Sequence, residues 1–177
     1  VCDPEQTRSF VGRVPGAEIV MLPKVGHGYS VPRNWMPQFR EVFHRLTSEQ
    51  PRPTPSSAGV GATAAPSDEL PDTTDLPVVE IPAASGAEVL AVFVSGDGGW
   101  AGIDREVGGA LAAAGVSVVG LDSLRYFWTA RTPEQTAADV ARIARRYLAA
   151  WHLERLLLAG YSRGADVLPF VANRLPA

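Results

Sequence analysis

The feature that most constrains the fold of this chain is the pentapeptide Gly160-Tyr161-Ser162-Arg163-Gly164. An apolar run precedes it at residues 156–159, and a segment with helical spacing follows from Ala165. Between a strand and a helix, a G-x-S-x-G sequence predicts a turn so tight that only glycine fits beside the serine, whose hydroxyl becomes an exposed nucleophile. We therefore interpret Ser162 as a catalytic nucleophile; the alternative is a chance occurrence of a short pattern.

The composition excludes several classes of protein. The 177 residues carry a formal net charge of −3, whereas nucleic-acid-binding domains usually present a basic face, so we expect no nucleic-acid partner. Cys2 is the only cysteine, which excludes an intrachain disulfide scaffold. No apolar run is long enough to cross a bilayer, and the start at Val1 lacks the features of a signal peptide, which indicates a processed or excised segment. We expect neither a metal nor a cofactor.

The chain divides by composition into three regions. Residues 47–75 are rich in Pro, Ser, Ala, Gly and Thr and lack periodicity, which predicts a solvated linker. An ordered loop within one domain is the alternative. The linker separates a short segment, residues 1–46, from a longer one, residues 76–177.

Hydrophobic periodicity predicts the secondary structure on both sides of the linker. In the first segment we expect a helix over 4–14, a strand over 17–22 and a helix over 34–46. Alternation of strands and helices in the second segment predicts an α/β fold with a parallel sheet. The expected strands are 77–81, 89–95, 116–121 and 155–159, and the expected helices are 104–114, 133–151 and 165–174.

A glycine-rich loop, Ser95-Gly96-Asp97-Gly98-Gly99-Trp100, follows the strand expected at 89–95. In hydrolases with a serine turn, such a loop supplies backbone N–H groups to the oxyanion of the tetrahedral intermediate. We assign the amides of Asp97, Gly98 and Arg163 to this oxyanion hole, and Trp100 to one wall of the site. A plain Asp-Gly turn is the alternative.

Arg125-Tyr126-Phe127-Trp128 follows the strand expected at 116–121, at the sheet edge where open α/β sheets bind ligands. Trp128 is a candidate to bind an acyl chain or lipid glycerol; packing under the long helix is the alternative. Arg125 and Arg163 are candidates to contact a phosphate, and simple solvation is the alternative. Asp166 is interpreted as an acidic residue that pairs with the dipole of the following helix.

The first segment contains a candidate base and a candidate acid. His27 lies in the loop Gly26-His27-Gly28-Tyr29 after the strand expected at 17–22, and Asp3 precedes a helix and that strand. This order resembles the end of a Ser…Asp…His triad. The alternatives are that His27 is an ordinary loop residue and that Asp3 only caps the helix.

Several of these motifs resemble the bacterial virulence protein family VirJ/AcvB. The resemblance covers residues 76–177 and rests on the glycine-rich loop, the serine pentapeptide with Ala165-Asp166-Val167, and two further stretches, Arg131-Thr132-Pro133-Glu134-Gln135-Thr136 and Asn173-Arg174-Leu175-Pro176. Longer AcvB-like members have two α/β hydrolase units in tandem. The resemblance implies that residues 1–46 end a first unit and that residues 76–177 form the N-terminal half of a second, so the α/β-hydrolase-like fold is expected to be incomplete.

The resemblance also implies an activity and a location. Such proteins are periplasmic in Gram-negative bacteria and hydrolyse the aminoacyl ester of lysyl-phosphatidylglycerol, with Ser162 at the nucleophile position. Arg163 departs from the aromatic residue expected after that serine, which puts substrate preference in question. The family's acid and histidine are expected beyond residue 177, so we expect this chain alone to be nearly inactive unless residues 1–46 dock as in a circularly permuted hydrolase.

A second hypothesis belongs to another class of function. Because a fold does not fix a function, a hydrolase scaffold can also serve as a non-catalytic binding or chaperone module. On this hypothesis the protein holds secreted virulence proteins, and surfaces around Trp100 or Trp128, rather than the Ser162 hydroxyl, carry its function.

Overall fold

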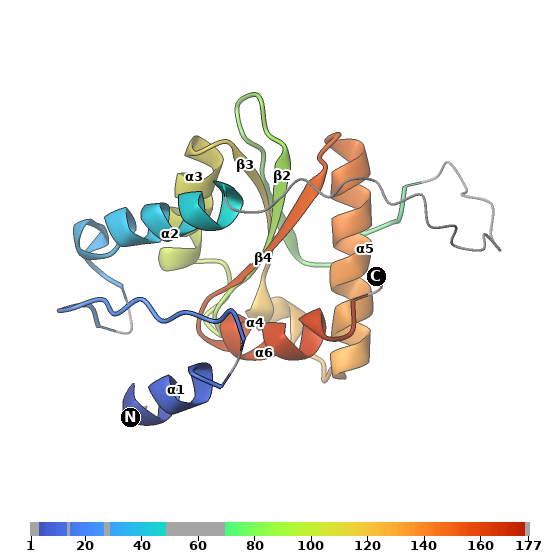
Figure 1. The fold of residues 1–177 in the computed structure, drawn as a ribbon. Helices are drawn as coiled ribbons and strands as arrows, with labels where there is room; N and C mark the ends of the chain where they lie inside the picture. The colour runs from blue at the N-terminus through green and yellow to red at the C-terminus, as the bar shows by residue number, and fades with distance from the viewer. Residues whose placement is uncertain (1–3, 14, 27–28, 49–69, 176–177) are drawn as a thin grey trace. The chain divides into compact units, whose positions relative to one another are not determined.

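The computed structural model describes residues 4–13, 15–26, 29–48 and 70–175. The chain divides into two compact units, Val1–Gly61 and Ala62–Ala177 (Figure 1).

The first unit contains two α-helices and one turn of 3₁₀-helix within its described residues. They are α1 (Pro4–Val11), η1 (Pro32–Asn34) and α2 (Met36–Ser48). Trp35 is buried between η1 and α2, where its indole Nε1 donates to the carbonyl oxygen of Tyr29 at 3.0 Å and its ring contacts Phe39 edge-on. Both helices expected in this segment are therefore confirmed, with α2 shifted by two residues at each end.

The strand expected at residues 17–22 is wrong. These residues are in neither a helix nor a strand. A strand is stable only when a neighbouring strand satisfies its backbone N–H and C=O groups, and the described part of this unit has no second strand. The apolar pattern was present, but the partner that turns such a pattern into a strand was not.

The second unit is built on a mixed four-stranded sheet with flanking helices, which confirms the α/β class. Its strands are β1 (Val78–Ile81), β2 (Val89–Val94), β3 (Val116–Leu121) and β4 (Arg155–Gly160). They lie in the order β1-β3-β2-β4. β2 pairs in parallel with both β3 and β4.

The sheet departs from the expected parallel arrangement at β1, which runs antiparallel to β3. No helix separates β1 from β2 in the chain. A parallel crossover needs a dozen or more residues, usually including a helix, and the short link over residues 82–88 does not provide them. The chain therefore reverses its direction between these two strands.

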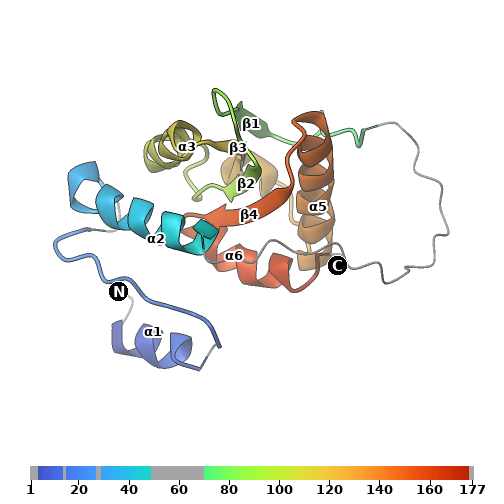
Figure 2. The same cartoon turned by 45° about the horizontal axis from the view of Figure 1, so that its top comes forward.

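The helices described in the second unit are α3 (Ile103–Ala113), α4 (Ser123–Tyr126), α5 (Pro133–Ala150) and α6 (Arg163–Ala172). Figure 2 shows the sheet between α3 on one side and α5 on the other. The two central strands are covered on both faces, so every residue of β2 and β3 is buried. None of the described helices combines the length and the apolar character needed to span a bilayer.

The long helix α5 begins where the sequence predicts. Thr132 accepts from the amide of Gln135 at 3.2 Å, and the Gln135 side chain accepts from the amide of Thr132 at 3.0 Å, which forms a capping box. Further along, Arg142 pairs with Asp75 at 2.8 Å and holds the segment before β1 against the helix. These contacts fix α5 next to the sheet edge at which the carboxyl ends of β2 and β4 lie.

Candidate active site

Ser162 lies in the bend between β4 and α6, where its backbone has φ 51° and ψ −118°. Residues with a side chain rarely adopt a positive φ, so the bend is strained. The amide of Gly164 donates to the carbonyl oxygen of Tyr161 at 2.8 Å, and the amide of Tyr161 donates to that of Val94 at 3.1 Å. The tight strand-turn-helix expected from the pentapeptide is thus present, and Ser162 is half-buried at its apex.

The two glycines of the pentapeptide are required by close backbone contacts. A Cβ atom at Gly164 would lie 2.0 Å from the carbonyl oxygen of Val94 on the neighbouring strand. A Cβ atom at Gly160 would lie 2.6 Å from the carbonyl carbon of Gly164. No side chain fits at either position, so the sequence pattern and the sharpness of the bend have the same steric cause.

The glycine-rich loop after β2 lies beside this bend. A Cβ atom at Gly96 would lie 3.5 Å from the Cβ of Ser162, which shows how close the two backbones are. The loop is anchored to the end of β3 by a reciprocal pair of hydrogen bonds. The amide of Ser123 donates to Ser95 Oγ at 2.9 Å, and Ser123 Oγ donates to the carbonyl oxygen of Ser95 at 2.7 Å.

Asp104, which was not predicted from the sequence, holds the same loop through hydrogen bonds. Its side chain is buried, and its carboxylate accepts from the amides of Gly96 at 3.3 Å and Ala101 at 3.4 Å. Burial raises the pKa of Asp104 above its usual value, and these hydrogen bonds oppose that change. An aspartate in the first turn of the helix after a glycine-rich loop was the available signal.

The residues assigned to the oxyanion hole come from two elements. Asp97 and Gly98 lie exposed in the glycine-rich loop. Arg163 is the first residue of α6, and the first amides of a helix have no acceptor within it and carry a partial positive charge. The structure therefore brings the loop and the start of α6 to either side of Ser162, and the role of these three amides stays a prediction.

Trp100 is placed differently from the expectation. Its side chain is buried and contacts Phe93 edge-on, with 5.5 Å between ring centroids. The ring fills the space left by Gly120, where a Cβ atom would lie 2.2 Å from the Trp100 Cζ3 atom. Trp100 is a core residue and lines neither of the two cavities described next.

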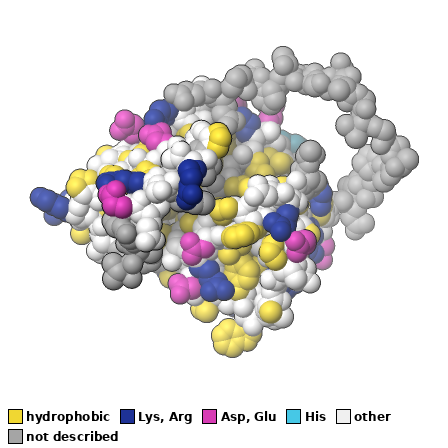
Figure 3. Space-filling view, turned by 60° about the horizontal axis from the view of Figure 1, so that its bottom comes forward, with side chains coloured by type: hydrophobic (Ala, Val, Ile, Leu, Met, Phe, Trp, Pro, Cys, Tyr) yellow, Lys and Arg dark blue, Asp and Glu magenta, His cyan; other side chains and the backbone are white. Residues whose placement is uncertain are grey.

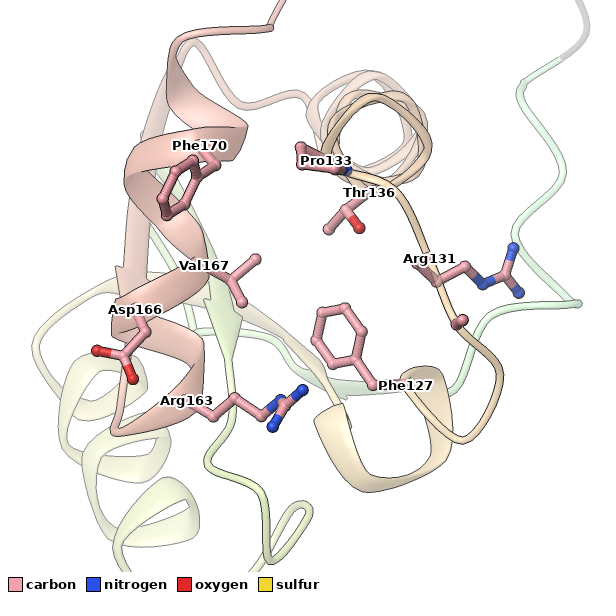
Figure 4. Close-up of a pocket in the computed structure, with 9 residues that line it drawn as sticks. Phe127, Arg131, Pro133, Thr136, Arg163, Asp166, Val167 and Phe170 are labelled. Carbon is pink, nitrogen blue, oxygen red and sulfur yellow. The ribbon is translucent and has the colours of Figure 1, made fainter.

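Two cavities lie beside the serine bend. The smaller, of about 370 Å³, is lined by Asp97, Ser123, Leu124, Phe127, Trp128 and Arg163. The larger, of about 560 Å³, lies between α6 and the start of α5 (Figure 4). Phe127 and Arg163 line both cavities. Trp128 is 84% exposed, so its ring is accessible to a ligand.

Of the remaining candidates, two lie outside the described residues and two are exposed. Asp3 and His27 lie outside the described residues. His152 precedes β4 and is therefore at the opposite end of that strand from Ser162. Arg125 is exposed on α4 and lines neither cavity. Asp166 is an exposed acidic residue in the first turn of α6, as expected.

The described residues include no group of three or more His, Cys, Asp and Glu side chains placed to hold a metal ion. What the described part of the site offers a ligand is a serine, backbone amides and the side chains that line the two cavities.

Part of the chain matches a known protein family. Residues 88–177, just over half of the chain, match the sequence profile of a family described as bacterial virulence protein (VirJ). The matched region begins just before β2 and includes the glycine-rich loop, both cavities and the serine bend. No curated protein and no solved structure gives a significant match.

Proposed function

Because this chain belongs to the VirJ family of bacterial virulence proteins, we propose that it forms part of a serine esterase that cleaves the aminoacyl ester of an aminoacylated phospholipid. The observation that carries the proposal is the strained bend at Ser162, with its positive φ and its two sterically required glycines. Strain of this kind persists at functional sites because the surrounding structure maintains it.

In the proposed reaction, Ser162 Oγ attacks the carbonyl carbon of the aminoacyl ester. A base, which we propose to be a histidine, takes the hydroxyl proton and then donates it to the departing lipid alcohol. The aminoacyl group stays on Ser162 as an ester. Water then attacks this ester, which releases the free amino acid and restores the serine hydroxyl.

The environment of Ser162 suits the charge that develops in this reaction. The tetrahedral intermediate carries a negative oxygen, and the start of α6 presents the Arg163 amide and the positive end of the helix dipole. The glycine-rich loop approaches from the other side, and its amides at Asp97 and Gly98 complete the proposed oxyanion hole. The buried Asp104 carboxylate keeps this loop in place by accepting hydrogen bonds from the amide of Gly96 in the loop and from that of Ala101 just after it.

The resemblance also leads us to propose the substrate and the compartment. A lysyl-phosphatidylglycerol-like lipid, presented at a membrane surface of the periplasm, fits the exposed Trp128 and the apolar lining of the larger cavity. His27 and Asp3 stay candidates for the base and acid. If the base lies elsewhere, the hydroxyl of Ser162 is a weak nucleophile in residues 1–177 alone.

A fluorophosphonate probe tests the nucleophile in the purified full-length protein. We expect one labelled serine, with labelling lost in Ser162→Ala and retained in the matched control Ser85→Ala, which removes an exposed hydroxyl from a loop remote in sequence. Release of free lysine from vesicles of lysyl-phosphatidylglycerol tests the substrate. Labelling that survives Ser162→Ala contradicts the proposal.

The exposed ring of Trp128 favours a second candidate function, a non-catalytic surface that binds secreted virulence proteins. Large exposed aromatic side chains are enriched at protein interfaces. On this candidate, Ser162→Ala keeps the protein's contribution to virulence and Trp128→Ala abolishes it. Loss of that contribution in a normally folded Ser162→Ala protein eliminates the candidate.

A further inference from the structure

Two residues of opposite charge line the smaller cavity. Asp97 belongs to the glycine-rich loop, Arg163 follows Ser162 directly, and both line this cavity. Among the described residues, neither side chain makes an ion pair. Elsewhere in this unit, arginines pair with carboxylates at 2.7 to 3.0 Å. Two opposite charges that do not pair with each other beside a nucleophile fit a ligand that carries both a cation and an anion.

The side of the cavity that contains Asp97 suits an ammonium group. The indole ring of Trp128 lines the same cavity and is 84% exposed. A carboxylate next to an open aromatic face is a favourable site for a cation, which gains both charge attraction and contact with the negative face of the ring. This pair therefore provides a binding site for an amino group near the acyl side of the ester.

Arg163 suits an anion and is held in a defined position. Its guanidinium carbon lies 5.6 Å from the centroid of the Phe127 ring, a stacking contact that restrains the side chain. A planar guanidinium binds phosphate oxygens in pairs. In Figure 4 the Arg163 side chain reaches from the start of α6 toward Phe127, and Asp166, on the same helix, also lines the larger cavity. Arg163 and Asp166 form no ion pair among the described residues, so the guanidinium stays available to an anion.

Beyond Arg163 lies the larger cavity, a groove whose lining is mainly apolar but also includes Arg131, Thr136 and Asp166. Figure 4 shows Phe127, Val167 and Phe170 around its hollow. Figure 3 views the molecule from the side at which α4 and α6 lie in Figure 1, and it shows hydrophobic side chains gathered among basic and acidic ones. Such a groove accepts a hydrocarbon chain.

We propose that the two cavities recognise, in one fixed orientation, an ester lipid that carries an ammonium group on its aminoacyl part and a phosphodiester on its alcohol part. Asp97 and Trp128 bind the ammonium group of the aminoacyl part, and Ser162 attacks the ester carbonyl. Arg163 binds the phosphodiester of the alcohol part, and the groove binds a fatty acyl chain of the lipid. Arg163 follows Ser162 in the chain and lines both cavities, so a phosphodiester bound there would lie next to both the ester and the groove. This inference rests on the proposed esterase function and adds the residues that select the substrate.

The first test uses two soluble esters that differ only by a terminal ammonium group, the p-nitrophenyl esters of Nα-protected lysine and Nα-protected norleucine. Asp97→Asn should lower kcat/KM for the lysine ester roughly fivefold more than kcat/KM for the norleucine ester. This variant keeps the backbone amide at position 97. Hydrolysis of the norleucine ester, which has no side-chain ammonium group, therefore reports whether the oxyanion hole is intact. Glu106→Gln, which removes an exposed carboxylate from α3, is the matched control.

The second test addresses the phosphate. Dihexanoyl-phosphatidylglycerol should inhibit norleucine ester hydrolysis more strongly than dihexanoylglycerol, which lacks the phosphodiester. Arg163→Gln should raise its inhibition constant about tenfold, because a charge-assisted bidentate contact is lost. Arg125→Gln removes an exposed arginine that lines neither cavity and should leave this constant unchanged.

The outcomes separate the two proposals. A wild-type protein that cleaves neither ester contradicts the esterase and this inference with it. If wild type and Asp97→Asn cleave both esters with the same ratio of kcat/KM values, the esterase proposal is retained and the assignment of Asp97 is overturned. An Arg163→Gln protein that binds the phospholipid as well as wild type overturns the assignment of Arg163.

Discussion

Gly164 marks the point at which the bend around Ser162 meets strand β2. A methyl group there would lie 2.0 Å from the carbonyl oxygen of Val94 and 2.8 Å from that of Ser95. We predict that Gly164→Ala lowers the free energy of unfolding by at least ~3 kcal/mol or prevents folding. Urea unfolding measures the change.

The control for this change is Gly109→Ala. Gly109 is exposed within α3, and a methyl group at this position would have nothing within 4 Å. Alanine should therefore raise the free energy of unfolding by roughly 0.5–1 kcal/mol through its higher helix propensity. If Gly164→Ala does not lower the free energy of unfolding relative to wild type, the close approach of α6 to β2 is wrong.

The positive φ of Ser162 gives a second prediction at the level of single residues. Glycine adopts φ 51° without the strain that a Cβ atom causes, whereas alanine keeps that strain. Ser162→Gly should therefore unfold with a free energy about 1 kcal/mol higher than Ser162→Ala. Both variants lack the hydroxyl, so the comparison isolates the backbone. Equal stability would mean that the bend is relaxed.

Among the elements, α5 depends on its first turn. Thr132 accepts from the Gln135 amide, and its carbonyl oxygen accepts from the Thr136 hydroxyl at 3.0 Å. We predict that Thr132→Ala lowers the free energy of unfolding by about 1 kcal/mol because one amide of the helix loses its acceptor. Thr129→Ala, in the exposed loop before the helix, should change it by less than ~0.5 kcal/mol.

The elements also show what sequence patterns can predict. The capping box and apolar stripe of α5 act within one or two helical turns, so its start at Pro133 was predicted correctly. The strand expected at 17–22 and the direction of β1 depend on distant partners. Local periodicity cannot supply that information. The strand itself requires a neighbour, and the direction of β1 is set by the helix-free link to β2.

The same distinction applies to the candidate site. The bend at Ser162 was predictable because its glycines and serine are adjacent in sequence. Trp100 was assigned to the site because it follows the glycine-rich loop, but its ring occupies a slot created by Gly120. Nothing near Trp100 in the sequence indicates that slot. Asp97 and Trp128 likewise line one cavity only because β2 and β3, which precede them in the chain, lie side by side.

At the scale of the whole molecule, the buried Asp104 links the site to the stability of the second unit. It connects α3 to the glycine-rich loop through the amides of Gly96 and Ala101. The loop is tied to β3 in turn through Ser95 and Ser123. A change in the protonation of this single carboxyl therefore alters hydrogen bonds that connect the loop with α3, and the loop in turn is bonded to two strands of the sheet.

This arrangement predicts how stability depends on pH. Because burial raises the pKa of Asp104 in the folded state, the folded protein holds this proton more tightly than the unfolded chain does. Between the unfolded and folded pKa values, the free energy of unfolding therefore falls as the pH rises. Asp104→Asn cannot titrate. We predict that the stability of wild type relative to Asp104→Asn increases as the pH is lowered from 7 toward ~4 and levels off below the unfolded pKa.

Urea unfolding of both proteins at a series of pH values measures this difference. Carboxyls that do not interact with Asp104 contribute equally to both proteins and cancel; Asp72, whose pKa is lowered by hydrogen bonds from Thr74, is one of them. The sign is the decisive feature, because a carboxylate stabilised mainly by its hydrogen bonds would have a lowered pKa and the opposite trend. A difference that shrinks toward low pH would mean that the amides of the glycine-rich loop, rather than burial, dominate the energetics of Asp104.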